Sequence, residues 1–291
     1  MKKTLAVCVA LVLVSLNFPN YATAKVVTPS AVKKKLLWSV EFGGKAGKRP
    51  VDFGFVYDFG YSNGWGNSEV QFYSRSKANA STDGKGKMVI TAKRIPFDHP
   101  VNIRYCGLGC EYTSARFKTQ GKMSFQYGRL EARIKNPPGI GTWPAFWLLG
   151  NDLGSKPWPD AGEIDIMEGK GTFPNTILGT VHGPGYSGGQ GISGSLFNVE
   201  PYVENYHVYA IEWKRNSIKW FIDDELFHQV TPASVSPNEW VFNKRYFLIM
   251  NLAMGGLFGG QTSENVTETK MYIDYIRYYS LDGVGSFRQK K

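Results

Sequence analysis

One stretch decides how this chain folds, and it reads Gly162-Glu163-Ile164-Asp165-Ile166-Met167-Glu168-Gly169. The alternation of acidic and apolar residues predicts a β-strand, in which successive side chains point to opposite faces. Glu163 and Asp165 then share one face, and the two isoleucines share the other. A regular strand would place Glu168 on the isoleucine face, because it lies five residues after Glu163. We therefore expect a β-bulge at Ile166-Met167, which adds one residue and returns Glu168 to the acidic face.

Three carboxylates on one face of a strand repel one another, which costs free energy unless the protein uses them. An ordinary solvated strand face is the alternative, and the flanking sequence argues against it. Residues 141–150 before the strand hold two tryptophans, and residues 179–187 after it hold a histidine and a tyrosine. Aromatic rings pack on the apolar faces of pyranose rings, and Trp, Tyr and His also supply hydrogen bonds. The pattern predicts a sugar-binding cleft in which two carboxylates hydrolyse a glycosidic bond.

The N-terminus has the pattern of a secretory signal peptide. Two lysines, an apolar run over residues 4–16 and Ala22-Thr23-Ala24 form an n-region, an h-region and a cleavage site, so we expect residues 1–24 to be removed. A retained anchor is the alternative. The apolar run is too short to span a bilayer comfortably, and no later segment is apolar enough to do so. We expect a secreted protein, extracellular or periplasmic, with no membrane span.

The rest of the chain is predicted to form one domain over residues 36–282, because no linker or low-complexity tract divides it. Residues 25–35 are expected to be a flexible lead-in and residues 283–291 a loose C-terminal tail. We expect a monomer. The net charge of +10 is scattered over the sequence, and no basic stripe indicates a nucleic-acid partner. The charge serves solubility or, alternatively, adsorption to anionic polymers.

The mature chain keeps two cysteines, Cys106 and Cys110, separated by Gly107-Leu108-Gly109. Secretion permits a disulfide between them, and two free thiols are the alternative. A zinc site would need two further ligands at the usual spacing, and none is nearby. Either state of the cysteines is structural rather than catalytic.

Strand signals recur at short intervals between Gly, Pro, Asn and Asp residues. The candidate strands are residues 37–42, 70–73, 87–94, 112–117, 127–134, 145–149, 163–168, 177–181, 206–213, 217–222, 226–230, 246–253 and 271–279. No segment has a sustained helical period, although residues 232–237 have room for one helical turn. The connections are too short for parallel crossovers, so we expect an all-β sandwich of two antiparallel sheets with a concave outer face.

The chain resembles glycoside hydrolase family 16, specifically its bacterial laminarinase-like endo-1,3-β-glucanases, from about residue 38 to residue 279. The matching segments are Gly64-Trp65-Gly66-Asn67-Ser68-Glu69, residues 127–135, Trp143-Pro144-Ala145-Phe146-Trp147, and residues 163–168, 179–187, 209–213, 251–256 and 272–277. The resemblance implies a β-jelly roll and a retaining double displacement that uses no cofactor. Glu163 would be the nucleophile, Glu168 the general acid/base, and Asp165 a hydrogen-bond partner of the nucleophile.

The extra residue Met167 bears on the substrate. Within the family it marks the bulged subgroup that includes laminarinases, whereas lichenases and xyloglucan transglycosylases lack it. We therefore expect hydrolysis of 1,3-β-glucan of the laminarin type. Mixed-linkage glucan, agar and carrageenan are alternative substrates, and transglycosylation is an alternative outcome of the same covalent intermediate. A non-catalytic glucan-binding protein is the alternative from another class, and the three retained acids argue against it.

The resemblance also implies substrate-binding residues. Trp143 and Trp147 would hold sugars on the non-reducing side of the cut, Asn67 and Arg129 would contact hydroxyls there, and His182 would lie near the leaving sugar. The alternatives are a core position for Trp147, a surface ion pair for Arg129 and a structural role for His182. Many relatives carry a Trp soon after Gly255-Gly256, where this chain has Leu257-Phe258.

Many relatives bind a structural calcium ion away from the cleft. Asp274 matches the usual carboxylate, and backbone oxygens near Glu41 and Gly86 would complete the shell. Calcium takes six to eight oxygen ligands, and backbone carbonyls leave no trace in a sequence. The alternative is that Asp274 is an ordinary edge residue of the last strand.

Overall fold

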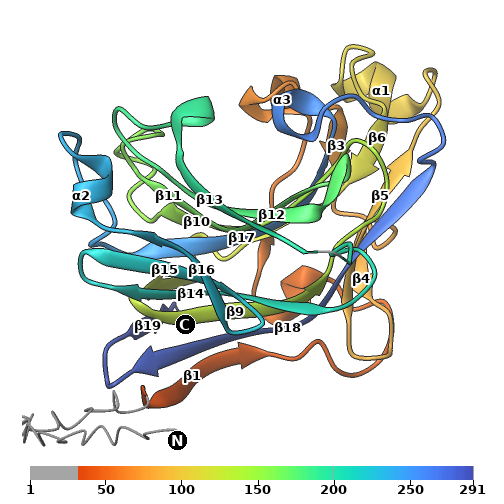
Figure 1. Ribbon diagram of the computed structural model, residues 1–291. Helices are drawn as coiled ribbons and strands as arrows, with labels where there is room; N and C mark the ends of the chain where they lie inside the picture. The colour runs from red at the N-terminus through yellow and green to blue at the C-terminus, as the bar shows by residue number, and fades with distance from the viewer. Residues whose placement is uncertain (1–31, 199, 291) are drawn as a thin grey trace, which may run out of the picture. The chain divides into compact units, whose positions relative to one another are not determined.

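The structure is a computed structural model that describes residues 32–198 and 200–290. The predicted signal peptide and most of the predicted lead-in lie outside these residues. Within them the chain forms two β-sheets that pack face to face around one large apolar core (Figure 1). The predicted all-β sandwich is confirmed.

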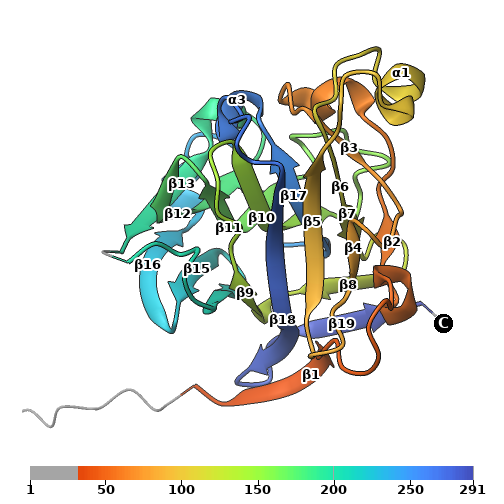
Figure 2. The same ribbon diagram turned by 90° about the vertical axis from the view of Figure 1, so that its right-hand side faces the viewer.

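Ten strands of the described chain form the first sheet. They are β1 Lys34–Val40, β3 Gln71–Tyr73, β4 Ala80–Thr82, β5 Met88–Arg94, β6 Tyr112–Ser114, β9 Gly128–Lys135, β14 His207–Lys214, β15 Ser217–Ile222, β16 Glu225–Val230 and β18 Glu268–Leu281. The hydrogen-bonded order is β16-β15-β14-β9-β18-β5-β6-β3, with β1 beside β18 and β4 beside β5. Figure 2 shows the long strand β18 beside β9 and β5. The pairs are antiparallel except β3–β6, which is parallel.

Nine strands of the described chain form the second sheet. They are β2 Val56–Tyr57, β7 Arg116–Lys118, β8 Met123–Gln126, β10 Thr142–Gly150, β11 Glu163–Lys170, β12 Phe173–His182, β13 Ile192–Phe197, β17 Tyr246–Met254 and β19 Ser286–Gln289. The order is β13-β12-β11-β10-β17-β7-β2, and β8 pairs with both β17 and β19. The acidic strand β11 therefore lies inside this sheet, between β10 and β12.

Short helices connect the strands. The α-helices are α1 Pro100–Tyr105, α2 Pro232–Val235 and α3 Gly256–Gly259, and the 3-10 helices are η1 Pro50–Phe53, η2 Ser62–Gly66 and η3 Gly188–Gln190. The helical turn predicted at residues 232–237 is confirmed by α2. Helix α1 was not predicted. It begins at a proline, and the His99 side chain accepts a hydrogen bond from the backbone of Val101. A disulfide between Cys106 and Cys110 follows α1.

The alternation of side chains explains how the two sheets meet. In β14, Tyr209, Ile211 and Trp213 are buried in the core. Strand β17 is buried along its whole length. One of its faces packs into the core, while Phe247 and Ile249 on the other face join Leu149 in a small separate cluster. These apolar side chains on the outer face are buried, and Trp147 and Leu153 pack against them.

The two ends of the domain differ from expectation. Strand β1 begins at Lys34, inside the predicted lead-in, and β19 lies inside the predicted tail and pairs with β8. The prediction of a loose tail is therefore wrong. The tail forms a strand because Phe287 stacks on Trp38, with 5.8 Å between ring centres, and also packs against Phe125. A single aromatic residue among Gly, Arg, Gln and Lys gave too weak a signal for a strand. In the described part of the chain, no helix has the length and apolarity needed to cross a membrane.

Candidate active site

The predicted bulge is present in β11. On the β10 side, Trp147 pairs with Asp165 and Phe146 with Met167, so Ile166 has no partner there. On the β12 side, the four residues of β11 from Asp165 to Glu168 lie opposite only three residues of β12, Leu178 to Thr180. The extra residue restores the alternation as predicted. Ile164, Ile166 and Met167 are buried in the core at 0–1 % exposure, and the three acids lie on the opposite face.

We call this side of the second sheet the acidic face and define it by Glu163, Asp165 and Glu168. Each acid has its own partner. The Trp158 indole donates a 2.7 Å hydrogen bond to Oε2 of Glu163, and the Trp143 indole donates a 3.0 Å bond to Oε1 of Glu168.

Asp165 lies between the two glutamates in the strand and is contacted by Trp220 and His182. Its backbone oxygen accepts a 2.7 Å hydrogen bond from the indole of Trp220, which reaches across from the first sheet. That indole passes directly beside Gly179 of β12, where a Cβ atom would collide with it. The Asp165 Oδ2 atom lies 3.2 Å from Nε2 of His182, and His182 pairs with Glu163 across the strands.

The acids carry more protons than free carboxyl groups would. Burial raises the pKa of Glu163 to about 8 and the pKa of Glu168 to about 7, and nearby His182 opposes both shifts. Burial and the charge of Glu168 raise the pKa of Asp165 well above its ordinary value. Asp165 is the least exposed of the three, at 3 %. Because ionising a buried group costs free energy, the protonated form of all three acids is favoured near neutral pH more than it would be in water.

Aromatic rings flank the acidic face on two sides. Trp143 packs against Phe258, with 4.8 Å between ring centres, and Nζ of Lys170 lies 3.9 Å from the centre of the Phe258 ring. On the other side, Trp158 packs against His182 at 6.2 Å. The Trp143 and Phe258 rings are tilted by 35° to each other. Each flank presents an indole that also donates a hydrogen bond to one glutamate.

Trp147 lies between the acids and a cationic group on β7. Its side chain is on the acidic face, since it pairs with Asp165, and its indole donates a 2.7 Å bond to Oδ1 of Asn251. The guanidinium of Arg116 lies 4.8 Å from the Trp147 ring and 5.0 Å from the Trp65 ring. Asp58 holds Arg116 through a 2.8 Å ion pair. The expected position of Trp147 beside the acids is thus observed.

Asn67 lies next to the Phe258 flank. Its backbone oxygen accepts a 2.8 Å hydrogen bond from the amide of Leu257, and its side chain donates a 3.3 Å bond to Glu69. Glu69 is buried, and Gln71 and Tyr73 also donate to it. Burial raises the pKa of Glu69. This further buried acid, Glu69, was not predicted from the sequence.

Arg129 does not reach the acidic face, and its predicted contact with substrate hydroxyls is wrong. It lies on β9 in the first sheet, where Leu130 points into the core and Arg129 therefore points outward. It is 2 % exposed and forms ion pairs with Glu131 at 2.7 Å and Asp224 at 2.7 Å. The ion-pair alternative is the observed one. Arg116 of β7 is the arginine that the fold brings to the acidic face.

The residues predicted to bind calcium do not fit that ion. Asp274 accepts a 2.6 Å bond from Lys87 on one oxygen and a 2.6 Å bond from Arg133 on the other. These cations lower its pKa. The Glu41 carboxylate accepts hydrogen bonds from Nε and Nη2 of Arg277 at 2.8 and 3.0 Å. A divalent cation at Asp274 would be repelled by Lys87 and Arg133, which already contact this carboxylate.

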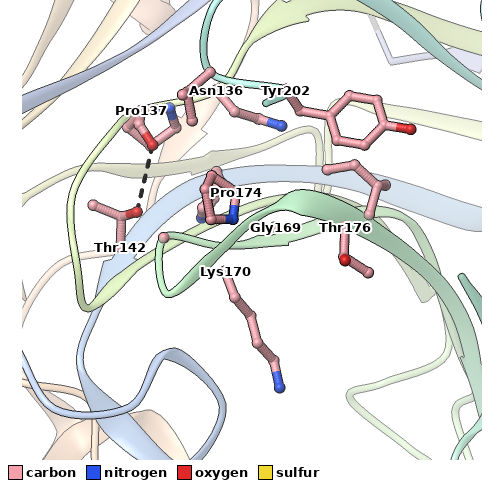
Figure 3. Close-up of a pocket in the computed structure, with 12 residues that line it drawn as sticks. Asn136, Pro137, Thr142, Gly169, Lys170, Pro174, Thr176 and Tyr202 are labelled. Carbon is pink, nitrogen blue, oxygen red and sulfur yellow. Dashed lines mark hydrogen bonds between the residues drawn. The ribbon is translucent and has the colours of Figure 1, made fainter. Parts of the chain in front are cut away.

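A small pocket opens at the far end of β11, and Figure 3 shows part of its lining. Its lining residues are Asn136, Pro137, Thr142, Pro144, Gly169, Lys170, Gly171, Pro174, Thr176, Ile177, Tyr202 and Val203, and they do not include the three acids. The Lys170 side chain extends away from the other labelled residues. The pocket marks the turn between β11 and β12 that carries Lys170 to Phe258, and it is not the site of the acids.

Several residues of this surface escaped the sequence reasoning. Trp158 lies in an irregular loop. Arg116 on β7, Asp58 directly after β2 and Asn251 on β17 are brought together only by the sheet order. Trp158 could have been predicted, because residues 151–162 lead directly into the acidic strand and a Trp there is close to the acids in sequence. The other three had no local signal, since each matters only through its cross-strand partner.

Comparison with known proteins places these features in a family. Residues 61–277 match the model "Glycosyl hydrolases family 16". A beta-glucanase from Rhodothermus marinus is 39% identical over 255 residues, which are 84% of this chain and 85% of that protein.

Two solved structures of similar sequence share the fold. The endo-beta-1,3-glucanase from Pyrococcus furiosus superposes with a TM-score of 0.78 at 38% identity, over 87% of this chain and 96% of that one. The laminarinase from Rhodothermus marinus gives a TM-score of 0.75 at 38% identity, over 86% of this chain and 99% of that one.

Proposed function

The chain belongs to glycoside hydrolase family 16, and on this premise we propose that it is an endo-acting hydrolase of 1,3-β-glucans of the laminarin type. Its β-jelly roll is that of the laminarinases it resembles. The observation that carries the proposal is the bulged strand β11, which turns Glu163, Asp165 and Glu168 toward one surface between two indole donors. Two carboxylates and a water molecule suffice for this chemistry, so no cofactor is needed.

In the first step, Glu163 attacks the anomeric carbon and Glu168 gives its proton to the glycosidic oxygen of the leaving sugar. A glycosyl ester on Glu163 results. In the second step, Glu168 takes a proton from water, and the water oxygen displaces Glu163 from the anomeric carbon. Two inversions at this carbon leave its configuration unchanged.

The surroundings of the acids support the acid role of Glu168 and bear on the ionisation of Glu163. Glu168 has to be protonated before the first step, and its pKa of about 7 keeps a large protonated fraction near neutral pH. Glu163 has to be ionised. Burial raises its pKa to about 8 and opposes this, while the charge of His182 and the hydrogen bond from Trp158 favour the ionised form. A proton on any one of the three acids reduces the repulsion among them.

The choice of 1,3-β-glucan rests on the relatives and on Met167. The two solved relatives described above are an endo-beta-1,3-glucanase and a laminarinase. Trp143 and Trp147 supply indole rings suited to stack on pyranose faces, and Asn67 and Arg116 lie at positions suited to bind hydroxyls. Arg116 takes the place that the sequence had given to Arg129.

Secretion is a further part of the proposal, supported by the signal pattern of residues 1–24, and so is a monomeric state. N-terminal sequencing of the protein recovered outside the cytoplasm should begin at Lys25. Calcium has no place in the proposal, because Lys87 and Arg133 already neutralise Asp274.

The test is a panel of laminarin, mixed-linkage β-glucan, agarose and carrageenan, with release of reducing ends as the readout. We expect activity on laminarin, with mid-chain products that show endo cleavage, and proton NMR should show the β-anomer as the first product. Glu163→Gln should be inactive, and Glu204→Gln, an exposed matched control, should keep full activity. Preference for a galactan, or unimpaired turnover by Glu163→Gln, would reject the proposal.

A further inference from the structure

We propose that the acidic face binds one divalent transition-metal ion, such as Zn²⁺, through Glu163, Asp165 and His182, and that this ion inhibits hydrolysis. The inhibition rests on the proposed function, whereas the metal site rests on geometry alone. One donor atom from each of the three residues lies within 4.8 Å of the other two.

The spacing of the donors suits a tetrahedral ion. Zinc bonds to carboxylate oxygen and imidazole nitrogen are about 2.0–2.2 Å long, so two ligand atoms of a tetrahedral site lie roughly 3.3–3.6 Å apart. Oδ2 of Asp165 and Nε2 of His182 are 3.2 Å apart before any ion is bound. Glu163 is partly exposed and can move its carboxylate toward this pair. A water molecule would take the fourth position.

An unsatisfied buried oxygen points to a cation at this place. Among the described residues, Oδ2 of Asp165 has no hydrogen-bond partner, although the residue is only 3 % exposed. Nδ1 of His182 is also without a partner there. Buried polar atoms without partners cost free energy, and an ion bound to Oδ2 would remove that cost. The indole of Trp158 binds only Oε2 of Glu163, which leaves Oε1 for a metal.

The electrostatics favour the same ion. Among the described residues, the three acids form one ion pair, that of Asp165 with His182. No Lys or Arg of this part of the chain lies in contact with them. A dication would offset their mutual repulsion. Three donors that include an imidazole suit Zn²⁺ or Cu²⁺, whereas Ca²⁺ and Mg²⁺ require more oxygen ligands. An ion bonded to Glu163 would block its attack on the anomeric carbon.

The binding test uses calorimetric titration of ZnCl₂ into protein that carries no histidine tag, without any glucan present. We expect one ion per chain, tighter binding at pH 8 than at pH 6 because the metal displaces protons from its ligands, and at least tenfold weaker binding to His182→Gln. His207→Gln is the matched control, because His207 pairs with Asp223 at 2.6 Å but belongs to no group of three metal-ligating side chains in the described part of the chain. Equal binding by wild type and His182→Gln, or no binding by wild type, would overturn the site.

The activity test measures initial rates on laminarin with ZnCl₂, with CaCl₂ and after addition of EDTA. We expect Zn²⁺ at ten times its Kd to lower the rate roughly tenfold, EDTA to restore it, and Ca²⁺ to have no effect. Laminarin should weaken zinc binding by competition. Zinc binding without loss of rate would overturn the inhibitory role. A chain that binds zinc in the calorimeter but hydrolyses none of the polysaccharides would instead contradict the proposed function and leave the metal site standing.

Discussion

The indole nitrogen of Trp143 donates a 3.0 Å hydrogen bond to Oε1 of Glu168. The same indole ring packs against Phe258, whose other neighbour is the ammonium of Lys170. A residue suited to stack on a sugar therefore also stabilises the ionised form of the proposed general acid. Substrate binding and proton affinity are coupled through one side chain.

This coupling makes Trp143→Phe a test of the acid assignment. The hydrogen bond of Trp143 lowers the pKa of Glu168, so its loss should raise that pKa above its present value of about 7. Glu168 acts in its protonated form, and the alkaline limb of kcat/KM against pH should therefore move to higher pH. The lost bond and smaller ring should also lower kcat/KM about tenfold. In Trp240→Phe, a control away from the acids, the limb should stay in place, and a limb that stays in place in both variants would contradict the assignment.

Azide separates the roles of the two glutamates. In Glu168→Ala, azide can attack the glycosyl ester without base assistance, and an activated aryl β-glucoside should yield the β-glycosyl azide. In Glu163→Ala, azide takes the place of the nucleophile and should yield the α-azide. Both variants should lose at least about 10²-fold in kcat on laminarin before rescue. The product anomer is read by NMR, and exchanged anomers would mean that the two roles are reversed.

Arg116 and Arg129 form a matched pair of substitutions. Arg116→Met removes the cation between Trp147 and Trp65, and KM for laminarin should rise about three- to tenfold with kcat nearly unchanged. Arg129→Met, in the first sheet, leaves Glu131 on β9 and Asp224 between β15 and β16 of that sheet without their buried partner. It should lower the free energy of unfolding by about 3 kcal/mol and leave KM unchanged. A raised KM in Arg129→Met would show that this arginine binds substrate after all.

The acidic face should destabilise the fold at high pH. The pKa of Glu168 rises on folding from 4.5 to about 7, so its contribution to stability is present below pH 4.5 and is lost as pH rises through about 7. Glu168→Gln cannot ionise, and above pH 7 it should exceed the wild type in stability by roughly 1–3 kcal/mol. Calorimetric Tm values at pH 5 and pH 8.5 should show a gain only at the higher pH. An equal gain at both would mean that ionisation of Glu168 is not the cause.

Chelation should leave the fold unchanged. Lys87 and Arg133 already hold both oxygens of Asp274, so EDTA should not lower Tm and added CaCl₂ should not raise it. Lys87→Met should lower Tm whether or not calcium is present, because it removes an ion pair rather than a metal. A Tm that falls with EDTA and recovers with calcium would show that the ion displaces these two cations.

The sequence allowed the acidic face to be predicted because its logic is local. Alternation and one odd spacing are enough to require a bulge between Asp165 and Glu168, and the structure has it there. The two-sheet architecture followed similarly from the many short strands with brief connections. Both inferences depend on neighbours in the chain rather than on partners in space.

Arg129 shows where local reasoning fails. Its match to a family segment was good, but Leu130 beside it is a core residue, and the sheet that contains β9 faces away from the acids. Arg116 and Asp58, 58 positions apart in the chain, meet through the pairing of β2 with β7. Such pairs depend on strand order, which hydrophobic pattern alone does not determine. The C-terminal strand β19 was missed for a related reason. Phe287 packs against Trp38, which lies at the other end of the domain in sequence, and the sequence does not show that contact.

The bulge in β11 also bears on how such a surface could change over time. Without Met167 the segment would read Glu-Ile-Asp-Ile-Glu, and simple alternation would keep all three carboxylates on one side with no irregularity. Strands with and without the extra residue thus preserve the same parity of acids while differing in local bend and in the distance spanned. Gain or loss of one apolar residue would change the shape of the surface that binds the polymer and leave the reactive carboxylates on the same side. The choice of polymer and the cleavage chemistry can therefore diverge independently.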